Sequence, residues 1–421
     1  MHKWRTRTVA VSALVAGLMA TTASPGAGAA VPDQWAAPSA TGANTGANLG
    51  ERAITASSAA RLQSAWRMND GGNRSISPVI ARGVVYQAVD GSTTTVSRLV
   101  ALDVRTGKRL WQIPLAGPGR SYIHGPSLAG DVLVLPYSGY RRPAGVTAVN
   151  VKTRKVLWSR SRPPATDPTS DDSTSGPVVV DAGRVYFVAA GTYVSAHDLR
   201  TGRLVWQKSL PGSWVEGMAA SGGRLYTGGS ATGLSEPSLV VYDGRTGRRL
   251  WSARGVDGRP VVVGATVLAM RGSSVVAFPA AGCGRSACSP RWSTALPGAH
   301  PGVARIGGAA GSTAFVVAGN TLKRTTRLLR LDTSTGRVQW SANRPHGASG
   351  PPIRAGSTVW LFENATTITG WSVSGSATKP LRTIQVAADD QGALATLSVA
   401  GGTLVHASWP DKLTGYRIRG R

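Results

Sequence analysis

The pattern AHDLRTGRLVW occupies Ala196–Trp206, and ALDVRTGKRLW repeats it at Ala101–Trp111. Each copy predicts a strand that ends at the Asp, a tight turn through Thr-Gly, and a second strand that ends at the Trp. The Gly supplies the positive φ that such a turn needs, and the Asp carboxylate can accept hydrogen bonds from the turn amides. The pattern therefore predicts a series of β-hairpins along the chain.

Tryptophans mark the ends of successive units with a spacing of 41 to 48 residues, at Trp66, Trp111, Trp158, Trp206, Trp251, Trp292 and Trp340. Each unit holds four short apolar runs, and a period near 45 residues with four strands per unit is typical of a β-propeller. The seventh unit is degenerate, because Leu381 stands where its Trp is expected. We interpret these tryptophans as structural, each ring packing between neighbouring blades.

The two ends of the repeat region complement each other. The last unit supplies three strands, and a lone strand ending at Trp66 lacks the three that should precede it. Together they make one complete blade, which closes the ring and protects its strand edges. The sequence predicts an all-β, eight-bladed β-propeller of four-stranded antiparallel blades over residues 61–421, in which the N-terminal strand pairs with the C-terminal three.

The N-terminus reads as a secretory signal over residues 1–29, with Lys3, Arg5 and Arg7 before an apolar run and a small-x-small site at Ala27–Ala29. Residues 30–60 are rich in Ala, Ser, Thr, Gly and Asn, carry no period, and are expected to form a flexible segment. No transmembrane segment is expected. We therefore expect a secreted protein that is extracellular or associated with the cell wall.

The 421-residue chain carries a formal net charge of +27. A strongly basic exported protein is attracted to anionic surfaces, although the charge can also be a solvated turn surface without a partner. Specific nucleic-acid binding is not expected, since no aromatic stacking pattern interleaves with the Arg residues. The two cysteines, Cys283 and Cys288, are expected to form a local disulfide in an oxidising compartment.

The repeat resembles the tryptophan-docking repeat of the pyrroloquinoline quinone (PQQ) propellers, on the motifs at 101–111 and 196–206 and near-complete copies at 241–251 and 330–340. The resemblance covers about residues 61–421. That family includes eight-bladed quinoprotein dehydrogenases and cofactor-free propellers such as the barrel-assembly lipoprotein of outer membranes, to whose members this chain is closest in size. The motif maintains blade packing, so it implies the fold more strongly than any activity.

Marks of the enzyme branch are missing from the sequence. The resemblance would imply two adjacent cysteines over the quinone, long insertions around the site and, in haem-bearing relatives, Cys-x-x-Cys-His, and none of these occurs. No Ser-His-Asp order, Walker loop or zinc-protease motif occurs either. We therefore expect no cofactor and assign no catalytic or metal-binding residue. A PQQ-dependent oxidoreductase with PQQ and calcium in its central funnel is the alternative.

Residues just before each innermost strand should surround one mouth of the central channel. These candidates for a ligand-binding rim are Arg74, Tyr122, His124, Asp172 with its neighbour Asp171, Trp214, Glu216, Arg259, His300, His346, and Asp389 with its neighbour Asp390. Their carboxylates and imidazoles could converge on a small molecule or an ion, or they could belong to ordinary polar loops. The sequence thus favours a monomeric, non-enzymatic propeller that binds a protein, a glycan or an anionic cell-wall polymer.

Overall fold

The computed structural model divides the chain into two units, Met1–Val31 and Pro32–Arg421, and only the second contains residues that the structure describes. The described residues are 33–69, 77–90, 96–118, 120–122, 125–139, 144–161, 175–189, 193–209, 213–231, 237–300, 303–320, 325–344, 347, 350–375, 379–387, 395–408 and 412–419. The expected signal sequence lies outside them and remains a prediction.

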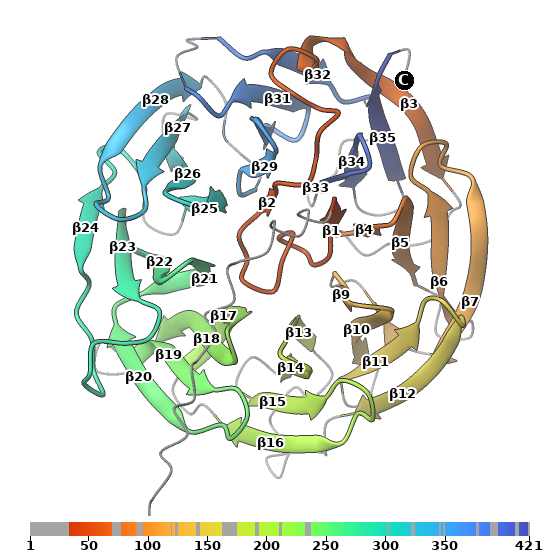
Figure 1. Ribbon diagram of the computed structural model, residues 1–421, viewed down its shortest axis with the longest axis horizontal. Helices are drawn as coiled ribbons and strands as arrows, with labels where there is room; N and C mark the ends of the chain where they lie inside the picture. Colours follow the sequence, from red (N-terminus) through yellow and green to blue (C-terminus); the bar gives the residue numbers. More distant parts are fainter. Residues whose placement is uncertain are drawn as a thin grey trace, which may run out of the picture. The chain divides into compact units, whose positions relative to one another are not determined.

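Eight antiparallel sheets, the blades, surround a central channel (Figure 1). Strands are given from the inside outward. Blade 1 consists of β4 (Val79–Ala81), β5 (Val84–Val89), β6 (Val96–Asp103) and β7 (Arg109–Pro118), and blade 2 of β9 (Ser127–Ala129), β10 (Val132–Gly139), β11 (Gly145–Asn150) and β12 (Lys155–Ser161). Blade 3 consists of β13 (Ser175–Asp181), β14 (Arg184–Ala189), β15 (Tyr193–Asp198) and β16 (Leu204–Ser209), and blade 4 of β17 (Ser213–Ser221), β18 (Arg224–Ala231), β19 (Pro237–Asp243) and β20 (Arg249–Arg254).

Blades 5 to 8 follow the same order. Blade 5 consists of β21 (Asp257–Val263), β22 (Thr266–Arg271), β23 (Ser274–Pro279) and β24 (Trp292–Ala295), and blade 6 of β25 (Arg305–Ala310), β26 (Thr313–Asn320), β27 (Thr325–Asp332) and β28 (Val338–Arg344). Blade 7 consists of β29 (Ile353–Ala355), β30 (Thr358–Glu363), β31 (Thr367–Ser372) and β32 (Arg382–Gln385), and blade 8 of β33 (Ala395–Ala400), β34 (Thr403–Ser408), β35 (Lys412–Ile418) and β3 (Leu62–Asn69). The outermost strand of blade 8 is N-terminal, so the predicted eight-bladed fold and its closure are confirmed.

Three short strands lie beside this regular set. Two come from the N-terminal segment: β1 (Gln34–Trp35) pairs with β4, and β2 (Ala47–Asn48) pairs with β29. The third, β8 (Arg120–Ser121), pairs with β10. A single 3-10 turn at Ala59–Arg61 leads into β3. Among the residues that the structure describes, no helix reaches the length and hydrophobicity that a membrane span requires.

The repeat motif builds the junctions between blades. In blade 3, Asp198 Oδ1 accepts hydrogen bonds from the Thr201 amide at 3.0 Å and its hydroxyl at 2.8 Å, which fixes the turn. Gly202 has φ +69°, and a Cβ there would lie 2.5 Å from the Trp158 ring of blade 2. Trp158 Nε1 also donates to the Leu199 carbonyl at 3.0 Å. A turn glycine of the next blade meets the ring in the same way at Trp66, Trp206, Trp251, Trp292 and Trp340. Trp111 instead lies beneath Arg154, which takes the place of the Gly in blade 2.

The hydrophobic core lies mainly between neighbouring sheets. One cluster, for example, combines Val188 and Trp206 of blade 3 with Met218, Leu225 and Tyr242 of blade 4. Each blade buries both of its faces in this way, because the alternating side chains of a strand point to opposite faces. Buried polar side chains also occur between the blades, among them His197, Glu363 and His406.

Candidate functional site

The channel has two chemically different ends. Every innermost strand begins at one end, which we call the start face, and reaches its hairpin turn at the other, which we call the turn face. The described rim candidates Glu216 and Arg259 belong to the start face, near the beginnings of β17 and β21. The Asp-Thr-Gly turns belong to the turn face, since the Leu199 amide beside Asp198 donates to Gly183 O in the inner hairpin turn.

Residues 33–48, here called the central segment, run inside the channel against the innermost strands. Their carbonyl oxygens accept hydrogen bonds of 2.7 to 2.9 Å from the strand amides, in the pairs Ala36–Leu128, Gly42–Ala220, Ala43–Val262, Thr45–Ala309, Gly46–Arg354 and Asn48–Gly356. Asp33 Oδ2 accepts from the Gly401 amide of blade 8, and β1 pairs with blade 1. A Cβ at Gly42 would lie 2.7 Å from Val180 O of blade 3. One segment thus meets all eight blades.

Residues 33–60 therefore make many hydrogen bonds and packing contacts, whereas the sequence suggested a flexible segment. Trp35 is fully buried, and the Asn44 side-chain amide donates to the Pro260 carbonyl at 3.1 Å. The Ala-, Gly- and Asn-rich composition suits this location, because small residues let the segment approach the strand backbones closely. The segment closes the channel from the side of the turn face.

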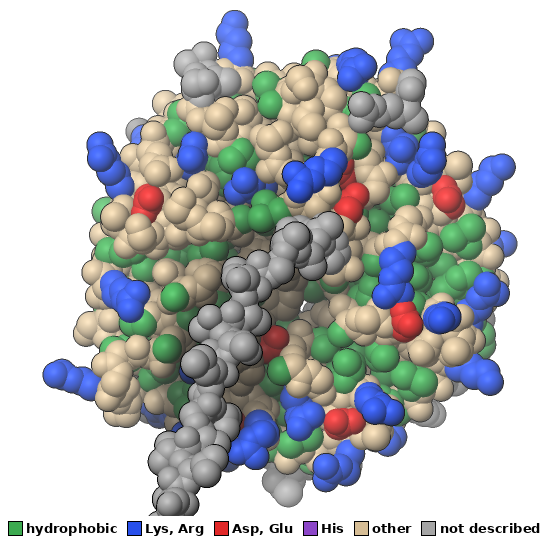
Figure 2. All heavy atoms as spheres, in the orientation of Figure 1, with side chains coloured by type: hydrophobic (Ala, Val, Ile, Leu, Met, Phe, Trp, Pro, Cys, Tyr) green, Lys and Arg blue, Asp and Glu red, His purple; other side chains and the backbone are tan. Residues whose placement is uncertain are grey.

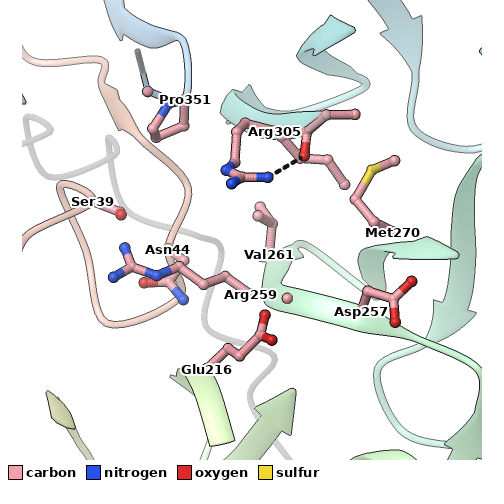
Figure 3. Close-up of a pocket in the computed structure, with 13 residues that line it drawn as sticks. Ser39, Asn44, Glu216, Asp257, Arg259, Val261, Met270, Arg305 and Pro351 are labelled. Atoms are coloured by element: carbon pink, nitrogen blue, oxygen red, sulfur yellow. Dashed lines mark hydrogen bonds between the residues drawn. The ribbon is translucent and has the colours of Figure 1, made fainter. Parts of the chain in front are cut away.

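A pocket of about 400 Å³ remains between the central segment and the inner strands of blades 4 to 7 (Figure 3). Its charged and polar lining residues are Ser39, Asn44, Glu216, Asp257, Arg259 and Arg305. Ser39 and Asn44 belong to the central segment. The others stand at or near the beginnings of β17, β21 and β25, so the pocket lies on the side of the start face.

Two β-bulges direct the side chains of Glu216 and Arg259. The register of β17 skips Glu216 between Val215 and Gly217, and that of β21 skips Gly258 to Pro260. A bulge turns its extra residue out of the ladder, which is a common way to aim a side chain at a site. A Cβ at Gly217 would lie 2.2 Å from Arg259 Cγ, so the glycine makes room for the Arg259 stem.

The pocket combines opposite charges. Loss of hydration inside the channel, and then the neighbouring Arg305 guanidinium, lower the pKa of Arg259 below its usual value. Asp257 Oδ2 accepts a hydrogen bond from the Gly272 amide at 3.0 Å, whereas Glu216 has no hydrogen-bond or ion-pair partner among the described residues. Two guanidinium groups that line one pocket favour a ligand with carboxylate or phosphate groups.

The structure brings only part of the predicted rim together. Glu216 and Arg259 line one pocket, whereas Tyr122 is fully buried between blades 1 and 2, with its ring 5.6 Å from that of Tyr137. His300 is half-buried in a bend, where its amide donates to Gly319 O, and it does not line this pocket. Trp214 belongs to β17, but its side chain is not among the described ones. The remaining candidates lie outside the described residues: Arg74, His124, Asp171, Asp172, His346, Asp389 and Asp390.

Sequence reasoning missed Ser39, Asn44, Asp257 and Arg305. Arg305 starts an innermost strand just as Arg259 does, so the same positional rule could have selected it in place of His300. The central segment gave no comparable signal. Its residues follow no period, and only the folded ring shows that they reach the channel.

The residues do not fit the calcium ion that accompanies PQQ in the site that the fold implies. The disulfide between Cys283 and Cys288, with Cα atoms 5.8 Å apart, is confirmed, but it lies in the turn between β23 and β24. There it faces the outermost strand of blade 4, since the Cys288 amide donates to Ser252 O. Among the described residues no three His, Cys, Asp or Glu side chains converge, and the two guanidiniums in the pocket would repel a divalent cation.

Comparison with known proteins agrees with this architecture. A family profile described as outer membrane protein assembly factor BamB matches residues 39–173 and 142–380. The solved structure of quinohemoprotein alcohol dehydrogenase ADHIIG from Pseudomonas putida HK5 superposes with a TM-score of 0.66 at 13% identity, covering 93% of this chain and 81% of that one. At this identity the likeness concerns the fold alone.

Curated relatives match shorter stretches. Quinohemoprotein alcohol dehydrogenase ADH IIB of Pseudomonas putida is 29% identical over 176 residues, which cover 38% of this chain and 24% of that protein. BamB of Yersinia pestis is 29% identical over 171 residues, covering 39% of this chain and 40% of that protein. The chain thus spans less than half the length of these relatives.

Proposed function

Because the chain belongs to the PQQ-repeat family of BamB-type propellers, we propose that it is a secreted, non-enzymatic propeller that binds a protein, a glycan or an anionic cell-wall polymer. The observation that carries the proposal is the central segment. Its backbone is bonded to the innermost strands around the ring, so the channel is filled by the chain itself on the side of the turn face. The outer surfaces are then the larger area for contact with a partner.

The chemistry of the remaining pocket supports the same proposal. A quinone enzyme needs a metal ion beside its cofactor and a group that takes a proton from the substrate. In this pocket the Glu216 carboxylate has no second free carboxylate beside it among the described residues, and Asp257 is held by the Gly272 amide. Arg259 and Arg305 make the pocket suitable for an anion and unsuitable for Ca²⁺.

A PQQ-dependent oxidoreductase is the second candidate function. Two guanidiniums beside a cavity of about 400 Å³ could hold a small molecule with several carboxylates, as PQQ is. Relatives such as the quinohemoprotein alcohol dehydrogenase of Pseudomonas putida carry that activity in their names. The two candidates differ in whether the pocket or the outer surface is used.

A cofactor titration separates them. The purified mature chain would be titrated with PQQ in the presence of Ca²⁺ while tryptophan fluorescence, quinone absorbance and dye-linked alcohol oxidation are followed. The proposal expects no turnover in the wild type. Saturable quinone binding with turnover that is lost in Glu216→Gln and Arg259→Gln, but kept in the surface control Asp131→Asn, would overturn it.

A further inference from the structure

The turns between the third and fourth strands of the blades all lie on the turn face. In each case the amide after the motif Asp donates to the inner hairpin turn, in the pairs Val104–Gly83, Leu199–Gly183, Gly244–Gly223 and Thr333–Ser312. The repeat therefore places equivalent residues of every blade on one side of the ring, and these turns point toward the viewer in Figure 1. A side chain repeated in the motif becomes a circle of side chains on this face.

Basic residues occupy these turns in four adjacent blades. We call residues 103–109, 150–155, 198–203 and 243–249 of blades 1 to 4 the turn arc. Its Lys and Arg side chains are all exposed: Arg105, Lys108, Arg109, Lys152, Arg154, Lys155, Arg200, Arg203, Arg245 and Arg248, with Arg249 beside them. Figure 2 shows Lys and Arg side chains around this face, with few Asp and Glu side chains between them.

The acidic residues of the turn arc accept hydrogen bonds within their own turns, and Asp198 also pairs with Arg184 of β14 at 3.3 Å. Asp198 and Asp243 each accept hydrogen bonds from a Thr hydroxyl and from turn amides, which lower the pKa of both carboxyls. Blade 2 has Asn150 in place of the Asp, so its turn carries no acid at all. Among the described residues, none of the basic side chains of the turn arc forms an ion pair. Arg109 donates to Gln112, Arg249 donates to Ser252, and Arg154 stacks on the Trp111 ring. The other basic side chains of the turn arc are available to an external anion.

Exposed aliphatic side chains follow the basic residues of these turns in the sequence. Five of the six exposed large hydrophobic residues follow the Asp-type turns, namely Leu110, Val156, Leu157, Leu204 and Val338. An apolar surface beside a guanidinium lowers the local dielectric and strengthens its attraction to a phosphate group. Basic residues on edge strands also prevent edge-to-edge aggregation. The experiment must therefore distinguish this protective role of the basic side chains from binding of an anionic ligand.

We propose that the turn arc binds a linear, phosphate-bearing polymer of the cell envelope, which runs from turn to turn across blades 1 to 4. The guanidinium fork matches phosphate oxygens in pairs. This inference rests on the proposed binding function and identifies the surface and the ligand class.

Two alternative occupants fit less well. A flat anionic bilayer would touch the turns of all blades, yet the blade 7 turn between β31 and β32 has Lys379 as its one basic residue, fewer than any turn of the turn arc. A nucleic acid would gain from exposed rings that stack on its bases, but Trp158 and Trp206 are buried against the next blade. A polymer needs only a continuous basic track.

The test uses the purified mature chain and poly(glycerol phosphate) of defined length as the probe. Binding would be measured by calorimetry at about 50 mM and about 200 mM salt, because counterion release makes phosphate contacts salt-dependent. The variant Lys152→Gln with Lys155→Gln removes two charges from the turn arc. The matched control Lys208→Gln with Arg254→Gln removes two exposed charges from strand ends nearer the start face.

We expect the turn-arc variant to bind about tenfold more weakly at the lower salt concentration and to show a shallower salt dependence. The control variant should bind like the wild type. Equal weakening of binding in both variants would show that net charge alone attracts the polymer. Failure of the wild type to bind the polymer would show that the polymer is not the ligand. Either result would overturn the inference. Tighter binding to phosphatidylglycerol vesicles or to oligo(dT) would replace the polymer with a membrane or a nucleic acid.

These outcomes are independent of the cofactor titration. A chain that shows no quinone turnover and no polymer binding would keep the proposed binding function and lose this surface. A chain with turnover would lose the proposed function whether or not the polymer binds.

Discussion

The junction between blades 3 and 4 and the junction between blades 6 and 7 solve the same packing problem with different chemistry. At the first, Trp206 packs on Gly247, its Nε1 donates to Gly244 O at 3.0 Å, and the surrounding cluster is apolar. At the second, the turn is longer, and Arg344 forms two hydrogen bonds of 2.9 Å with the fully buried Glu363. Where the repeat weakens, an ion pair joins the blades.

The seventh and eighth blades hold further buried polar groups. Glu363 Oε2 also accepts from the Thr369 hydroxyl at 2.9 Å, and the Arg344 guanidinium stacks 5.1 Å from the Trp371 ring. His406 of blade 8 lies 4.7 Å from the Phe362 ring, and neither imidazole nitrogen has a hydrogen-bond partner among the described residues. The junction between blades 6 and 7 therefore adds a buried ion pair to the contact of Trp340 with Gly375, whereas the regular junctions depend on shape alone.

The largest expected effect is at Glu363. Replacing Glu363 by Gln leaves the Arg344 charge buried without its counterion, and removing one member of a buried pair costs about 3–5 kcal/mol. Chemical denaturation should show a free energy of unfolding lowered toward that range. The double variant Glu363→Leu with Arg344→Met should recover much of the loss. A loss below about 1 kcal/mol, typical of an exposed ion pair, would mean that the pair does not join the blades.

The second effect concerns pH and His406. Burial lowers the pKa of His406 from 6.5 to about 4, so the unfolded chain binds this proton at a higher pH than the folded one. Stability should therefore fall as the pH drops from about 6.5 to about 4, by up to about 3 kcal/mol for this group. Denaturation curves across this range should show a smaller fall in His406→Leu than in the wild type.

The regular blades offer a control for this pH effect. His197 of blade 3 is also buried, but its ring nitrogens lie 3.2 Å from Gly202 O and 3.1 Å from the Ser195 hydroxyl. Its pKa is lowered by burial, which the hydrogen bond to Gly202 partly opposes. His197→Gln should therefore reduce the acid-dependent fall less than His406→Leu does. The reverse order would place the acid sensitivity in the regular blades.

The last comparison separates the cost of the ring contact from the cost of the backbone conformation within blade 3. Gly202 and Gly183 have φ of +69° and +72°, but a Cβ would meet the Trp158 ring at 2.5 Å only in the first. Gly183→Ala should cost about 1 kcal/mol for its left-handed backbone, and Gly202→Ala about 1–3 kcal/mol more for the forced contact. Thermal unfolding of both variants measures the difference. Equal losses would show that Trp docking adds nothing beyond the turn.

Much of the fold could be predicted because the same motif recurs in most units of the chain. The Asp, Gly and Trp of one unit specify a turn and a docking contact locally, and the period then sets the number of blades. The closure by β3 also followed from the sequence, since a lone strand at one end matched a missing strand at the other. The same rule selected Glu216 and Arg259, which lie at bulges near the beginnings of β17 and β21 and line one pocket.

Other parts could not be predicted, because they depend on contacts between residues far apart in sequence. Tyr122 stands in a rim position, yet its ring is buried against Tyr137, a choice that only side-chain packing makes. The Arg344–Glu363 pair joins two units whose motifs give no sign of it.

The sequence by itself determined the blades, their number, the docking tryptophans and the face that carries the basic turns, because each follows from a short motif repeated at a fixed period. Only the tertiary structure decided that residues 33–48 fill the channel, since this segment has no period and gains its partners from all eight blades at once. The closed ring also decided what remains for a ligand, a pocket with two guanidiniums on one side and a basic arc on the other.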